Sequence, residues 1–165
     1  AEQNLRRPLE LGPANRKHEA SSDARHYLHQ LLAQVGLSPE DARKRPTQMS
    51  GGMQMRLSLA RALVTEPQIL LLDEPFAAVD DFLRMRLQED IRRLHDARNL
   101  TTVLVTHNLQ EAIFLSDRVI VLSGKPAEVT KSLEIAWSGP RDVGFRNGDQ
   151  YVDYVRQLSA SLLES

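Results

Sequence analysis

The chain has 165 residues, of which 41% are hydrophobic and 26% charged, a composition typical of an ordinary globular domain with a real core. Its formal net charge of −1 argues against a polyanion, nucleic acid or an acidic membrane surface as the partner. Cysteine is absent, which excludes disulfides, thiolate nucleophiles and cysteine-based metal sites. The longest apolar run near the middle covers residues 69–72 and is far too short to cross a membrane.

The first segment, Ala1 to Ala20, is polar and contains Pro8, Gly12 and Pro13. It carries no helix-start signal, so it is predicted to be a connecting segment. Because the chain opens on an alanine in the middle of such a segment, we expect it to be a piece of something longer.

Two helices are predicted next. Ser22 can cap a helix through about Val35, and Gly36 follows as a stop. Its inward face is predicted to carry Leu28, Leu31, Leu32 and Val35. After a loop with room for one helical turn, residues 52–65 are rich in leucine, alanine, methionine and arginine and predict a second helix.

From residue 69 onward the pattern alternates between strands and helices. The run Ile69–Asp73 is continuously apolar, which predicts a strand buried on both faces. Asn108, with Glu111 three residues on, predicts a capping box. The predicted elements are a strand at 69–73, a helix at 83–99, a strand at 101–107, a helix at 108–116, strands at 118–123 and 127–137, and a helix at 151–163. This alternation implies right-handed crossovers and a mainly parallel sheet, so the fold class is α/β.

Polar residues end the first two strands. Asp73 and Glu74 close the first and His107 the second, and ligands of parallel sheets bind at these carboxyl ends. One carboxylate can reach Mg²⁺ while the other orients or deprotonates a water. Acidic residues can also merely end a strand, but Pro75 next to them and Asp80 soon after favour the functional reading. His107 alone is equally compatible with a polar residue that closes a strand.

Ser50, Gly51 and Gly52 stand at the start of the second predicted helix. A hydroxyl, free backbone N–H groups and a helix N-terminus suit a phosphate, and glycine lets the backbone approach it closely. The same tripeptide is also an ordinary helix start, so by itself it leaves both readings open. Other polar side chains are predicted to be solvated, namely His18, His26, His29, His95, Arg84, Arg86, Arg92 and Arg93.

These signals occur in an order that resembles the ATP-binding cassette (ABC) ATPases. MSGGMQMRLSLARAL (49–63) resembles their signature motif and the helix after it, and ILLLDEP (69–75) their Walker B strand with its catalytic glutamate. AAVD (77–80) resembles the D-loop and VTHNLQEAI (105–113) the switch-histidine segment. The resemblance is close over residues 47–122 and extends loosely back to Leu5. The sequences SGGMQ (50–54), DEPF (73–76) and HNLQEAI (107–113) most resemble those of the ATPase subunits of bacterial importers of the nitrate, sulfonate and taurine type.

The resemblance implies a P-loop NTPase fold of the ABC type, an α/β fold with a partial parallel sheet and a helical subdomain. It divides the chain into a lead-in at 1–21, a helical subdomain with the signature motif at 22–66, part of a RecA-like ATPase core at 67–137, and a C-terminal turn and helix at 138–165. Residues 28–64 of the helical subdomain are expected to contact a membrane permease.

The resemblance also implies a head-to-tail dimer that holds ATP between two subunits. Ser50, Gly51, Gly52 and Gln54 would contact the nucleotide held by the partner subunit. Asp80 would connect the two sites across the interface.

In the chain's own site, Glu74 would position or activate water and Asp73 would hold Mg²⁺ through water. His107 would sense the γ-phosphate of ATP. The protein is expected at the cytoplasmic face of a bacterial inner membrane as a peripheral subunit, without nucleic acid and without direct contact with the transported substrate.

One element of the family pattern is not found. The Walker A loop ends in Gly-Lys-Ser/Thr, and no such tripeptide occurs in the sequence. The chain alone is therefore predicted to bind ATP weakly and to be inactive. Two alternatives stay open: the C-terminal lobe of a chromosome-maintenance or DNA-repair ATPase, and a non-catalytic interaction module. The first should follow a heptad coiled coil, which does not precede Met49, and intact Glu74 and His107 count against the second.

Overall fold

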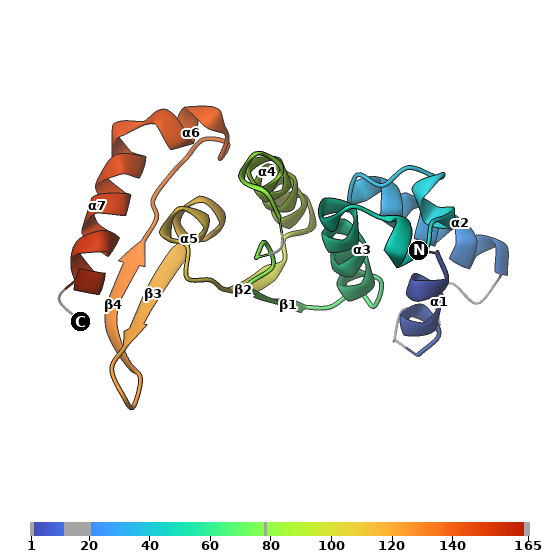
Figure 1. Ribbon diagram of the computed structural model, residues 1–165, viewed down its shortest axis with the longest axis horizontal. Helices are drawn as coiled ribbons and strands as arrows, with labels where there is room; N and C mark the ends of the chain where they lie inside the picture. Colours follow the sequence, from blue (N-terminus) through green and yellow to red (C-terminus); the bar gives the residue numbers. More distant parts are fainter. Residues whose placement is uncertain (1, 12–20, 78, 164–165) are drawn as a thin grey trace. The chain divides into compact units, whose positions relative to one another are not determined.

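The protein is described by a computed structural model in which residues 2–11, 21–77 and 79–163 are placed. The chain divides into two compact units, residues 1–103 and 104–165. The elements of the first unit, in order, are α1 (Glu2–Leu11), α2 (Ser21–Gln34), η2 (Asp41–Arg43), η3 (Pro46–Gln48), α3 (Gly51–Leu63), β1 (Ile69–Asp73), α4 (Asp81–Arg98) and the first part of β2 (Thr101–Val105) (Figure 1).

Helix α1 occupies residues that were predicted to form a helix-free connecting segment, so that prediction was wrong for residues 2–11. Leu5 and Leu9 lie one turn apart and are fully buried where α1 packs on α2 and α3. Tertiary burial of this face outweighs the missing start signal and the backbone hydrogen bond lost at Pro8. Residues 12–20 of the predicted segment, with Gly12 and Pro13, lie outside the described residues.

The predicted helix that ends at Gly36 is confirmed as α2. All four predicted inward residues are buried, namely Leu28, Leu31, Leu32 and Val35. Gly36 has a φ of +74°, and the Leu37 N–H donates to the Leu32 carbonyl at 2.9 Å. This is the Schellman arrangement, in which glycine accepts the left-handed conformation and the following N–H satisfies a terminal carbonyl. The Ser22 side chain lies outside the described part of the chain.

Arg56 on α3 joins three helices of the first unit. Its guanidinium donates to the Val35 carbonyl at 2.7 Å, at the C-terminus of α2, and pairs with Asp90 on α4. A cation beside the last carbonyls of a helix also interacts favourably with the helix dipole. Arg56 therefore holds the signature helix in register with its two neighbours.

The prediction of a solvated arginine face on α4 was wrong for two of its members. Arg84 is half-buried and donates to the Val79 carbonyl at 2.9 Å, so it folds back over the start of its own helix. Arg92 lies largely out of solvent and pairs with Asp96 at 3.0 Å. Arg93, by contrast, is exposed as predicted. Helical spacing alone did not separate these neighbours, because the long side chains bend toward different partners.

Strands β1 and β2 are hydrogen-bonded neighbours, and α4 connects them, as a crossover connects parallel strands. The prediction that Ile69–Asp73 is buried on both faces was wrong. Leu70 is 5% exposed, whereas Ile69 and Leu71 are 58% and 72% exposed. The described residues therefore cover only one face of β1, and the strand alternates between buried and exposed positions.

The second unit contains the end of β2, α5 (Leu109–Leu115), β3 (Arg118–Ser123), β4 (Glu128–Glu134), α6 (Val143–Asn147) and α7 (Asp149–Leu163). Strands β3 and β4 form an antiparallel hairpin, from the pair Arg118 and Glu134 to the pair Ser123 and Glu128. The sequence predicted both strands but a mainly parallel sheet. The connection over 124–127 is too short for a parallel crossover, so it forces the antiparallel pairing. Helix α6 lies in the segment after residue 138 that was predicted as a turn, and the Asp142 side chain caps it.

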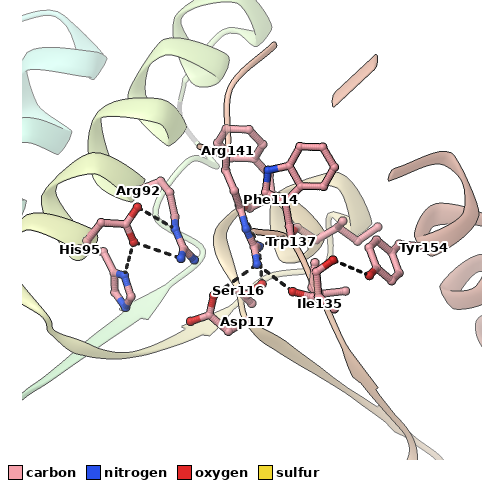
Figure 2. A network of polar contacts seen from close by, with 12 residues as sticks. Arg92, His95, Phe114, Ser116, Asp117, Ile135, Trp137, Arg141 and Tyr154 are labelled. Atoms are coloured by element: carbon pink, nitrogen blue, oxygen red, sulfur yellow. Dashed lines mark hydrogen bonds and ion pairs between the residues drawn. The ribbon is translucent and has the colours of Figure 1, made fainter. Parts of the chain in front are cut away.

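Helices α5 and α7 pack on the hairpin around an aromatic and aliphatic core (Figure 1). Arg141 is buried within this unit, with its side chain only 4% exposed. Its guanidinium donates to the carbonyls of Ile113 (2.9 Å), Phe114 (3.3 Å), Ser116 and Ile135 (3.1 Å) and to the Asp117 carboxylate (3.2 Å) (Figure 2). Arg141 therefore satisfies the terminal carbonyls of α5 and ties this helix to the end of the hairpin.

Candidate functional site

The signature tripeptide forms the start of α3. Ser50 is the N-cap residue, and its hydroxyl accepts a hydrogen bond from the Met53 N–H at 3.3 Å. Gly51 and Gly52 are the first two helical residues, so their N–H groups have no acceptor within the helix. Ser50 and Gly51 are exposed. An open helix start with free N–H groups is an arrangement that accepts an anion.

Gly52 is buried and has a packing role that the sequence did not indicate. A Cβ at this position would lie 2.4 Å from Leu83 Cδ2 and 3.1 Å from Leu83 Cγ. Leu83 lies in the first turn of α4, and its N–H is capped by the Asp80 side chain at 3.0 Å. Glycine therefore allows the start of α3 to approach the start of α4, and so brings the signature motif and the D-loop aspartate onto adjoining helix ends.

Gln54 is exposed and ties the preceding loop to α3. Its amide nitrogen donates to the carbonyls of Pro46 at 3.1 Å and Met49 at 3.2 Å. These bonds anchor the backbone on the N-terminal side of Ser50. In this structure the side chain thus supports the conformation of the signature loop from within.

The acidic pair lies at the carboxyl end of β1. Asp73 is the last residue of the strand and is exposed, and Glu74 is half-buried. Glu74 has a φ of +42°, a left-handed conformation that is uncommon for a residue with a Cβ and costs on the order of 1–3 kcal/mol. The turn is closed by the Ala77 N–H on the Glu74 carbonyl at 3.2 Å and is anchored by the buried Phe76. The chain thus keeps a strained backbone at the predicted catalytic carboxylate.

The donor set at this end of β1 fits a hydrated Mg²⁺ ion. Asp73 offers one exposed carboxylate, and among the placed residues no group of three or more histidine, aspartate or glutamate side chains forms a metal cage. Magnesium commonly binds to one or two carboxylates and completes its shell with water and substrate phosphates. The residues present therefore suit a metal that arrives with a nucleotide.

His107 lies in the second unit, in the bend between β2 and α5, and is exposed. Hydrogen bonds fix the residues on either side of it. The Asn108 carboxamide caps α5, as predicted, by accepting from the N–H groups of Gln110 (2.9 Å) and Glu111 (3.2 Å). The second half of the predicted capping box was wrong, because the Asn108 N–H donates to the Thr106 hydroxyl. The Thr106 hydroxyl accepts from the Asn108 N–H at 3.1 Å and donates to the Glu111 carboxylate at 2.7 Å. Sequence reasoning missed Thr106, although a glutamate within the apolar run of α5 indicated a buried polar contact.

The comparisons with known proteins agree with this fold. A model of the family described as ABC transporter matches residues 2–77. The chain is 45% identical over 118 residues to an aliphatic sulfonates import ATP-binding protein of Pseudomonas savastanoi pv. phaseolicola, covering 72% of the chain and 49% of that protein. It is 40% identical over 130 residues to a nitrate import ATP-binding protein of Synechococcus elongatus, covering 78% of the chain and 47% of that protein. The chain thus spans about half the length of the curated relatives it matches.

A solved structure of a dimeric ATP-binding cassette in a post-hydrolysis state, bound to ADP and phosphate, is also similar. It superimposes with a TM-score of 0.60 at 28% identity over 72% of this chain and 50% of that one. The described residues include no helix with both the length and the apolar character needed to cross a membrane. By its sequence matches and its fold, the chain belongs to the ABC ATPase family, with relatives among the import ATP-binding subunits.

Proposed function

We propose that this chain provides the signature, Walker B, D-loop and switch-histidine elements of an ATP-hydrolysing subunit that energises a bacterial ABC import system. The observation that supports this proposal most strongly is that two structural features of the site occur together in this chain. The chain is 45% identical over 118 residues to an import ATP-binding protein. The first feature is the open glycine start of α3, and the second is the acidic end of β1 with its left-handed Glu74.

On the signature side, Ser50, Gly51 and Gly52 would contact the terminal phosphate of ATP held by a second subunit. Ser50 and Gly51 are exposed, which makes this surface available to a partner. Gln54 would contribute to nucleotide binding mainly by anchoring the loop that precedes Ser50. Asp80 would link the two nucleotide sites, since it caps the helix whose first turn packs against Gly52.

On the catalytic side, Glu74 would orient and accept a proton from the attacking water, and Asp73 would hold Mg²⁺ through water. His107 would hydrogen-bond the γ-phosphate. The metal would supply charge neutralisation of the phosphates when bound with ATP. Phosphoryl transfer depends mainly on such positioning and charge compensation, so small displacements of these three side chains should reduce turnover.

The partners of this subunit would be a second ATPase subunit, arranged head to tail, and a transmembrane permease at the cytoplasmic face of the inner membrane. The transported substrate would not touch these residues. No Gly-Lys-Ser/Thr is present in the 165 residues, so the chain alone should hydrolyse no ATP above background in a phosphate-release assay. Sustained turnover by the purified chain would contradict this account of the site.

A hybrid protein tests the proposal. The 118 matching residues of the Pseudomonas savastanoi relative are replaced by those of this chain, and ATP hydrolysis is measured. We expect the hybrid to hydrolyse ATP, and Glu74→Gln to lower kcat by about 10²–10⁴-fold while ATP binding is retained. Glu89→Gln, a half-buried glutamate on α4, is the matched control and should leave kcat unchanged. Full activity of the Glu74→Gln hybrid would refute the assigned role.

A further inference from the structure

Glu111 is a buried carboxylate that none of the assigned roles uses. It lies in the first turn of α5 and is 4% exposed. Its Oε2 accepts from the Thr106 hydroxyl at 2.7 Å, the length of a strong charge-assisted hydrogen bond. Burial of a carboxylate is costly unless it is hydrogen-bonded, so this contact helps to stabilise Glu111 inside.

The Thr106 hydroxyl carries the effect of Glu111 across His107. While it donates to Glu111, the same oxygen accepts from the Asn108 N–H at 3.1 Å. Asn108 is also fixed through its side chain, which caps α5. The residues immediately before and after His107 are thus both anchored, directly or through one hydroxyl, to the first turn of a helix.

Helix α5 is a firm base for this anchor. Its C-terminal carbonyls at Ile113 and Phe114 accept hydrogen bonds from the buried Arg141. Ile113 and Phe114 themselves are fully buried in the core of the second unit. A site residue is held most accurately when its supports are themselves fixed by packing and hydrogen bonds.

We infer that Glu111 is a positioning residue for His107, acting through the Thr106 hydroxyl and the Asn108 amide. This inference rests on the proposed function, because it assigns Glu111 to the same phosphate-sensing segment. Glu111 does not touch the nucleotide in this account. Its contribution is to restrict the backbone at His107, so that the imidazole meets the γ-phosphate without first having to be ordered.

The first test is carried out on the chain itself by NMR and amide hydrogen exchange. We expect Glu111→Ala to broaden or split the imidazole Cε1–H signal of His107. We also expect exchange of the Asn108 amide to accelerate on the order of tenfold, while amides in β3 change by less than about twofold. Thr106→Val has nearly the same shape without the hydroxyl and should do the same. This second variant keeps the test decisive where Glu111→Ala unfolds the unit.

Conservative variants separate positioning from simple stability. Glu111→Gln retains an oxygen that can accept from Thr106, and Thr106→Ser retains the hydroxyl, so both should restore the wild-type signal of His107. Gln110→Ala changes the exposed neighbour on the same helix and should have no effect. An unchanged His107 signal and Asn108 exchange rate in both Glu111→Ala and Thr106→Val would overturn the inference. Exchange that rises equally throughout the second unit would do so as well.

The hybrid ATPase provides the second readout. Glu111→Ala should lower kcat on the order of tenfold with the KM for ATP within about twofold, and Glu111→Gln should recover most of the rate. Full activity of Glu111→Ala beside an inactive His107→Ala hybrid would refute the inference and leave the proposed function standing. Full activity of both His107→Ala and Glu74→Gln would instead refute the proposed function.

Discussion

Removal of the Arg141 guanidinium should destabilise the second unit more than any other change of a single charged side chain that we describe. We consider Arg141→Met, which keeps an apolar stem of similar length. The substitution removes five hydrogen bonds, four of them to backbone carbonyls. It also removes the cation that contacts the terminal carbonyls of α5.

The size of this destabilisation follows from the carbonyl groups that lose the Arg141 hydrogen bonds. The carbonyls of Ile113 and Ile135 belong to buried residues, and each such unsatisfied group costs about 1–3 kcal/mol. Ser116 is half-buried and Asp117 exposed, so water replaces much of what is lost there. Loss of the favourable charge at the helix end adds about 0.3–1 kcal/mol. The expected loss of unfolding free energy is therefore about 2–7 kcal/mol.

Urea unfolding followed by tryptophan fluorescence measures this effect selectively. Trp137, the single tryptophan, lies in the second unit with its ring 5.0 Å from that of Phe145. With an m-value of about 2 kcal/mol/M, the midpoint should fall by about 1–3.5 M. Arg156→Met is the matched control, since this α7 side chain is 74% exposed and should change stability by less than about 0.5 kcal/mol. A loss below about 1 kcal/mol for Arg141→Met, or equal losses for both variants, would refute the reasoning.

Three further outcomes are expected. Gly52→Ala should destabilise the chain by about 0.5–2 kcal/mol, because its clash with Leu83 outweighs the gain of about 0.5–1 kcal/mol that alanine brings to a helix. Leu83→Ala should relieve much of that cost in a double-mutant cycle, and simple additivity would contradict the packing between the two residues. A hydrogen bond from Lys44 is the largest of the effects that lower the pKa of Asp41 to about 2, so the stability this carboxylate contributes is present above about pH 4 and lost as the pH falls toward 2. The unfolding free energy, measured as the pH is lowered, should therefore decrease by at most about 1 kcal/mol in the wild-type chain and should not show this decrease in Asp41→Asn. Identical pH profiles for the two proteins would contradict this prediction. Burial raises the pKa of Tyr151 above 10.0. The part of the ultraviolet absorbance titration that is missing in Tyr151→Phe should therefore have its midpoint above pH 10.0. A midpoint at or below that pH would count against burial of this hydroxyl.

Much of the local structure followed from residues whose effect does not depend on distant partners. Ser50 and Asn108 were predicted to start helices and Gly36 to end one, and all three do so. A side-chain oxygen caps the nearest free N–H groups, and glycine accepts a positive φ, in any tertiary setting. The order of the motifs and their spacing also led to the ABC family from the residues alone, which the comparisons bear out.

The tertiary structure decided whatever depended on which surfaces are covered. Burial of Leu5 and Leu9 made a helix of a segment without start signals, and the short turn after Ser123 set the direction of β4. The approach of Leu83 to Gly52 gave a proposed phosphate-binding glycine a second task.

The same division holds for the candidate site. The sequence by itself determined which residues can carry the chemistry, because carboxylates, glycines and a histidine at these positions have few equivalents. Only the folded chain decided which side chains support them. The bond from Thr106 to Glu111 and the carbonyls gathered around Arg141 depend on distances between atoms, and residue order alone does not specify those distances.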